Sequence, residues 1–200
     1  MGGELHGARI LALVLFGLIL CGPGAYAQSG PQGGGRELAL WTGGGHGING
    51  STSDTGVWNV GGRYGWVLTN PAGPRFLRGR FEYAVDVVPI FWVIQRTGIA
   101  YGFGLNPFEL KWNFETHRKA APYLSISGGT LFTNGQVPAG TSRVNFTSSG
   151  GLGIYILRGK HNWSIEVLFM HISNAGLSAP NPGINTVQAR IGLGRFSPPK

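Results

Sequence analysis

Apolar and polar side chains alternate with a period of two along most of the chain after residue 28. In residues 108–115 (FELKWNFE), aromatic and aliphatic residues occupy one set of alternate positions, and charged or amide residues occupy the other. A period of two is that of a β-strand, whose side chains point to opposite faces in turn. The alternation predicts strands at 36–45, 57–68, 78–88, 108–115, 122–132, 146–157, 163–173 and 187–196, the first being the weakest.

Two all-β architectures fit eight such strands, and they differ in which face points inward. A soluble barrel buries its apolar face, whereas a membrane barrel turns that face to the lipid. The polar face carries both signs, as in Arg63 and Glu109, which can neutralise one another inside a narrow barrel. The apolar face carries large aromatic residues, including Trp58, Trp66, Trp112 and Trp163. We therefore predict an eight-stranded antiparallel transmembrane β-barrel of the outer-membrane type, with a soluble barrel as the less favoured alternative.

The connections between these runs also fit a membrane barrel. Short connections are expected at 69–75, 116–121 and 158–161, and long ones at 46–54, 133–144 and 174–186. In an outer-membrane barrel, short turns and both termini lie on the periplasmic side, and long loops lie outside. The sequence thus predicts that residues 174–186 are extracellular.

Composition and charge narrow the class of protein further. Only 12% of the 200 residues are charged, 36 are glycine, and no internal apolar stretch is long enough for a helical membrane span. The net charge of +8 is scattered along the strands and not clustered. A nucleic-acid partner is therefore not expected, and a basic barrel among anionic lipids is the simpler interpretation.

The N-terminal residues have the pattern of a secretory signal. Arg9 precedes an apolar run over residues 10–20, and Ala-Tyr-Ala at 25–27 offers a cleavage site before Gln28. We predict a signal peptide over 1–27 and a single outer-membrane barrel domain over 28–200. The only cysteine, Cys21, lies in the signal, so the exported protein would have no disulfide and no thiol nucleophile.

The seventh predicted strand ends on two polar residues that interrupt its apolar face. His171 and Ser173 share the face of Val167 and Phe169 because strand side chains alternate. Polar groups facing lipid cost free energy unless they form hydrogen bonds or serve a function. A serine beside a histidine is the pair used in nucleophilic acyl transfer. The alternative interpretation is that these residues only mark where the strand leaves the membrane.

The segment that begins at His171, HISNAGLSAPNPG over 171–183, resembles the signature of the PagL family of lipid A 3-O-deacylases. That motif runs H-x-S-N-A-G, followed by P-N and a glycine. The resemblance implies an eight-stranded outer-membrane barrel with a Ser-His-Glu triad on its lipid-facing exterior. It implies Ser173 as the nucleophile, His171 as the general base, and the backbone from Asn174 to Gly176, with the Asn174 side chain, as donors to the oxyanion. Asn181 matches a further family position, as site support or as a residue that orders the loop.

The same resemblance implies the partners of the protein. The expected substrate is lipid A of lipopolysaccharide, which would lie among other outer-membrane lipids, and no cofactor is expected. Val167 and Phe169 would line an acyl groove, with Arg96 or Arg143 near the phosphates of lipid A. A homodimer is left open. His46, His117 and His161 have no partners at metal-ligand spacing, so no metal site is expected.

One triad position departs from the family pattern. The glutamate of the family falls on Asn185, at the start of the last strand and on the same face as Val187. An amide oxygen can orient an imidazole, but it lacks the charge that stabilises the imidazolium formed when serine attacks. The sequence thus leaves two readings open: a carboxylester hydrolase acting on lipid A, and a slow or catalytically inactive barrel with a structural or lipid-binding role.

Overall fold

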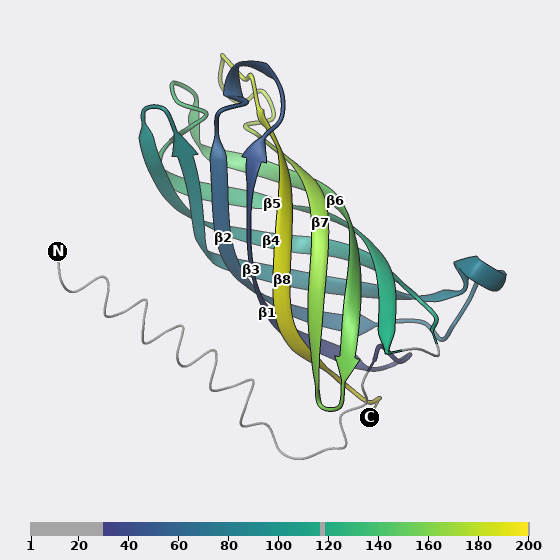
Figure 1. Cartoon of the computed structure of the whole chain (residues 1–200). Coiled ribbons are helices and arrows are strands. Elements are labelled where there is room, and N and C mark those ends of the chain that lie inside the picture. Colours follow the sequence, from purple (N-terminus) through teal and green to yellow (C-terminus); the bar gives the residue numbers. More distant parts are fainter. Residues whose placement is uncertain (1–29, 117–118, 200) are drawn as a thin grey trace, which may run out of the picture.

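The computed structural model describes residues 30–116 and 119–199 as a closed antiparallel barrel (Figure 1). Each strand pairs with the next along the chain, and the last pairs with the first. The strands are β1 (Arg36–Gly47), β2 (Gly56–Val67), β3 (Gly79–Gln95), β4 (Gly98–Phe114), β5 (Ala120–Val137), β6 (Ser142–Arg158), β7 (His161–Ser173) and β8 (Ile184–Ser197). The predicted fold class is confirmed. The predicted signal peptide, 1–27, lies outside the described residues.

Two short 3-10 helices, η1 (Gly50–Thr52) and η2 (Arg75–Leu77), lie in the connections. No helix within the described ranges has the length and apolar character needed to cross a membrane.

The polar face of the strands points into the barrel and the apolar face points out. Lys111 and Glu109 are almost completely buried, whereas Phe108, on the same strand β4, exposes 63% of its surface. The interior charges are paired: Arg63 lies 2.8 Å from Asp86 and 2.5 Å from Glu109. An eight-stranded barrel is only wide enough to be filled by side chains. This inside-out arrangement excludes the soluble barrel considered above.

Aromatic side chains form two clusters on the outer surface. Trp58 packs against Trp92 near one end of β2, and Trp66 packs against Tyr83 near the other. Trp58 and Trp66 are eight residues apart, about 27 Å of extended strand. With a strand tilt of about 40°, the clusters are separated by about 20 Å along the barrel axis. This spacing is typical of the aromatic girdles that border the apolar band of a membrane barrel.

β3 and β4 are longer than the alternation predicted, and together they absorb residues 89–107. The β3–β4 register shifts between Val88 and Phe91, and the β4–β5 register shifts between Leu105 and Phe108. A bulge inserts a residue and reverses which alternate positions face inward. A search for strict alternation therefore stops at each bulge, although the strand continues.

The predicted difference in loop lengths is wrong for two of the connections, β2–β3 and β5–β6. The β5–β6 connection, expected at 133–144, is only 138–141, because both strands extend beyond their predicted ends. Among the fully described connections, 68–78 is the longest, although it was expected to be short. The ends of the barrel are instead distinguished by the termini, since Arg36 pairs with Ser197 at one end. The β1–β2 and β7–β8 loops meet at the opposite end (Figure 1).

Candidate active site

The end of β7 and the start of β8 bring His171 and Asn185 opposite each other. These residues are cross-strand partners, and both lie on the outer face of the barrel. Ser173, the last residue of β7, shares this face two positions further along the strand. All three side chains are half-buried, in contrast to Ala175 and Leu177 of the following turn, which are exposed.

A hydrogen bond joins the two strands at this point. His171 Nδ1 lies 2.7 Å from Asn185 Oδ1, and Asn185 Nδ2 donates to Asn49 Oδ1 at 3.1 Å. Because the Asn185 oxygen can only accept, it selects the imidazole tautomer that carries its proton on Nδ1. Nε2 then has a free lone pair, which is the state that a general base requires.

Ser173 makes no hydrogen bond with His171 among the described residues. The two residues are separated by about 6.6 Å along the strand, so a change of side-chain rotamer is needed to join them. A second outward hydroxyl, that of Ser148, lies directly across from His171 on β6. The alternation of side chains along the strands could not indicate a role for Ser148, because the neighbours of a residue across strands depend on register and not on spacing along one strand.

The turn after Ser173 is ordered by the side chain of Asn174, which is completely buried. Its Oδ1 accepts from the N–H of Gly176 at 2.9 Å, and its Nδ2 donates to the backbone oxygen of Ser178 at 2.9 Å. The backbone N–H of Asn174 donates to Asn181 Oδ1 at 3.2 Å. These bonds support loop-ordering roles for Asn174 and Asn181. They also occupy three of the donors predicted for the oxyanion: the N–H groups of Asn174 and Gly176 and the side-chain NH₂ of Asn174.

Gly183 lies against the imidazole from the other side of the loop. Its φ of +65° is in the left-handed region, and a Cβ at this position would lie 2.7 Å from His171 Cε1. A side chain there would displace the ring. In the sequence, Gly183 stood out only as the last residue of the motif over 171–183, and no role was predicted for it.

The family model of lipid A 3-O-deacylases (PagL) matches residues 76–194 of the chain. The chain belongs to the PagL family. The matched segment runs from η2 into β8 and includes His171, Ser173 and Asn185, but it excludes Asn49. Among curated proteins, none matches this chain.

Solved structures with the same fold agree with this placement. The crystal structure of the outer-membrane enzyme PagL matches with a TM-score of 0.59 at 18% identity, over 78% of this chain and 97% of that one. Neisserial surface protein A gives 0.53 at 10% identity, over 83% and 99% of the two chains. The N-terminal β-barrel domain of Pseudomonas aeruginosa OprF gives 0.51 at 11% identity, also over 83% and 99%. At these identities the likeness concerns the fold alone.

Apolar side chains lie next to His171 and Ser173 on the outer face. Phe146 of β6 pairs with Ser173, and Phe169 of β7 pairs with Val187 of β8. Phe146, Phe169 and Val187 each expose between 41% and 44% of their surface. The sequence identified Phe169 as part of an acyl groove, but Phe146 reaches Ser173 only through the β6–β7 register.

The mouth of the barrel adjoins this site. Arg96 forms an ion pair with Asp54, and both line a hollow of about 190 Å³ together with Thr52 and Pro182. Thr52 Oγ1 also donates to the backbone oxygen of Gly183 at 3.0 Å, which connects the hollow to the loop over His171. Arg96 therefore lines a hollow that shares Thr52 with the loop over His171, and its expected place near the phosphates of lipid A stays a prediction.

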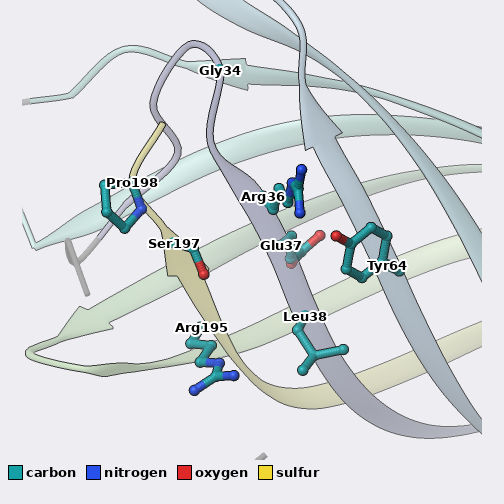
Figure 2. A pocket seen from close by; sticks show the side chains of 8 residues that line it. All are labelled: Gly34, Arg36, Glu37, Leu38, Tyr64, Arg195, Ser197 and Pro198. Atoms are coloured by element: carbon teal, nitrogen blue, oxygen red, sulfur yellow. The ribbon is translucent and has the colours of Figure 1, made fainter. Parts of the chain in front are cut away.

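A larger hollow, of about 280 Å³, lies at the other end of the barrel. Figure 2 shows Arg36, Tyr64 and Arg195 among the residues around it. This end carries the chain termini, so the hollow does not belong to the site at His171. The described residues contain no group of three histidine, cysteine, aspartate or glutamate side chains that could hold a metal ion.

Proposed function

We propose that this protein is an outer-membrane esterase that removes the 3-O-linked acyl chain of lipid A. The observation that carries the proposal is the hydrogen bond from His171 to Asn185 on the outside of the barrel, within the segment matched by the PagL family. This bond gives the imidazole the tautomer of a general base. The lipid-facing position suits a substrate that is itself a membrane lipid.

In the proposed mechanism, His171 Nε2 takes the hydroxyl proton of Ser173 as Ser173 Oγ attacks the ester carbonyl. The tetrahedral intermediate collapses, and the imidazolium returns the proton to the leaving 3-hydroxyl of lipid A. Water then attacks the acyl-serine with the same base and releases the fatty acid. The backbone N–H of Ala175 is the donor that we assign to the oxyanion, since the N–H groups of Asn174 and Gly176 are bonded within the turn.

The substrate would enter from the outer leaflet. With both termini periplasmic, His171 lies at the extracellular end, where lipid A is found. The acyl chain would lie along Phe146, Val167 and Phe169, and the phosphorylated headgroup would reach the barrel mouth. Arg96, whose side chain is 86% exposed, and Arg143, exposed near the start of β6, are the two cations that we assign to the phosphates. Export to this membrane would depend on the signal peptide expected at residues 1–27.

A second candidate function is a slow or inactive barrel of the same family that binds lipid without cleaving it. Two observations favour it: Asn185 carries no charge, and no hydrogen bond joins Ser173 to His171 among the described residues. In the serine-protease template, asparagine in place of the acid costs about 10⁴ in rate, because the wrong tautomer forms. The bond from Nδ1 to Asn185 Oδ1 argues against that loss here.

Mass spectrometry of lipid A from a Gram-negative host that expresses the protein would test both candidates. We expect wild type to remove one 3-O-linked hydroxyacyl chain, Ser173→Ala and His171→Ala to remove none, and Ser148→Ala to act like wild type. Intact lipid A in the presence of folded wild-type barrel would support the second candidate. Loss of activity in Ser148→Ala alone would move the nucleophile from Ser173 to the hydroxyl opposite His171.

A further inference from the structure

The β1–β2 loop reaches the candidate site from outside the segment matched by the family. The backbone N–H of Ile48 donates to the backbone oxygen of Asn185 at 3.0 Å, and Asn49 Oδ1 accepts from Asn185 Nδ2 at 3.1 Å. Thr52 adds its bond to the oxygen of Gly183. The loop therefore contacts both the residue that orients His171 and the residue that packs against its ring.

Three side chains form a continuous chain of hydrogen bonds at this point. The imidazole Nδ1–H of His171 donates to Asn185 Oδ1, and the Asn185 amide then donates to Asn49 Oδ1. If both amides turned over, Asn49 would donate to Asn185, whose NH₂ would donate to Nδ1. That opposite polarity would protonate Nε2 and leave His171 unable to act as the base toward Ser173. The direction of these hydrogen bonds thus decides whether His171 can act as the base.

We infer that Asn49 is a positioning residue that sets this polarity and so keeps His171 in its base-competent tautomer; the inference rests on the proposed function. A glutamate in the place of Asn185 would present only acceptor atoms to the imidazole and would need no such partner. An asparagine presents an oxygen on one side and an NH₂ on the other. It therefore requires an acceptor, here Asn49 Oδ1, to turn its oxygen toward His171.

The main chain holds position 49 in place independently of its side chain. The N–H of Ile48 is bonded to Asn185, and the N–H of Gly47 is bonded to the backbone oxygen of Thr55 at 2.7 Å. A substitution at Asn49 therefore changes the chemistry offered to the Asn185 amide while the loop stays where it is. The Asn49 side chain is exposed, so water competes for the same NH₂ group and the expected effects are moderate.

The first test is the tautomer of His171, measured by ¹⁵N NMR of the imidazole in the full-length folded barrel in nanodiscs, with His171→Gln to assign the signal. The spectra are recorded at about pH 9, well above the ordinary pKa of an imidazole. We expect wild type and Asn49→Asp, which can only accept, to hold the proton on Nδ1. Asn49→Leu should shift the population toward the Nε2–H form. An unchanged tautomer in Asn49→Leu would overturn the inference.

Thr52→Val provides the matched control, because it removes the loop's bond to Gly183 and leaves the Asn185 amide untouched. It should keep the wild-type tautomer. A shift as large as that in Asn49→Leu would mean that the loop acts only by general ordering, and would also overturn the inference.

The second test is the turnover number for release of the fatty acid from lipid A. A lost hydrogen bond of ordinary strength predicts that Asn49→Leu lowers kcat by about 3- to 10-fold, with recovery in Asn49→Asp. In an Asn185→Glu background the Asn49→Leu effect should disappear. If wild type cleaves nothing but the tautomer responds as expected, the proposed function fails and the polarity role stands. If wild type cleaves lipid A and the tautomer ignores residue 49, only the polarity role fails.

Discussion

The Nδ1 atom of His171 lies 2.7 Å from the side-chain oxygen of Asn185. The two residues are paired across β7 and β8 on the outer face of the barrel. The resemblance of the sequence to the PagL family implies a histidine and a glutamate at these positions. In the proposed function, Asn185 keeps the acceptor of that pair without its charge, so that it orients the imidazole but does not stabilise the imidazolium as a carboxylate would.

Asn185→Glu should raise the turnover of lipid A by only about 10-fold, because the tautomer is already correct and only the stronger, charge-assisted bond is gained. Asn185→Leu, which removes the acceptor, should lower turnover by 10² or more, up to about 10⁴. Both turnover numbers would be measured as the release of fatty acid by the purified protein in lipid A micelles. A gain near 10⁴ in Asn185→Glu would mean that the wild-type imidazole is in the wrong tautomer.

Gly183→Ala should reduce activity by displacing the imidazole, since the added Cβ would lie 2.7 Å from His171 Cε1. Gly140→Ala is a matched control: its φ is +83°, and a Cβ there meets nothing within 4 Å. Each substitution should cost about 1 kcal/mol in unfolding free energy for the left-handed backbone. Only Gly183→Ala should also lower kcat, and equal kcat values in the two variants would contradict the contact with His171.

Phe146→Ala should weaken the capture of the acyl chain, because Phe146 pairs with Ser173 on the lipid-facing side. Loss of part of an aromatic contact, about 1 kcal/mol, predicts a roughly 5-fold rise in KM with little change in kcat. The control is Phe108→Ala, which removes another outward phenylalanine from β4, three strands away from His171. Kinetics against lipid A carrying acyl chains of two lengths would check the prediction, and identical KM values for both variants would argue against an acyl groove at Phe146.

Alternation within each strand predicted the barrel and the face that meets lipid, because it determines which side chains share a face. The position of Asn185 beside His171 came instead from the resemblance to the PagL family. The alternation missed the second half of β3 and the first half of β4, where bulges near Val88 and Leu105 reverse it. Asn49 escaped notice because it contacts Asn185 across 136 residues, through the closure of β1 on β8. No local pattern specifies such a contact between a loop and a distant strand. The partners of His171 therefore depend on the register of the whole barrel.

Lys111→Met should destabilise the barrel strongly, because Lys111 is completely buried and its Nζ lies 2.8 Å from Glu37 and 3.5 Å from Glu82. Removing the cation leaves two carboxylates together in the interior, a change that typically costs about 3–5 kcal/mol. Arg78→Met is the control, since Arg78 pairs with Glu115 at the barrel end with 49% of its side chain exposed, and such pairs contribute about 1 kcal/mol or less. Reversible urea unfolding in lipid vesicles, followed by tryptophan fluorescence, would measure both. Similar losses in the two variants would mean that water enters the barrel and screens the interior charges.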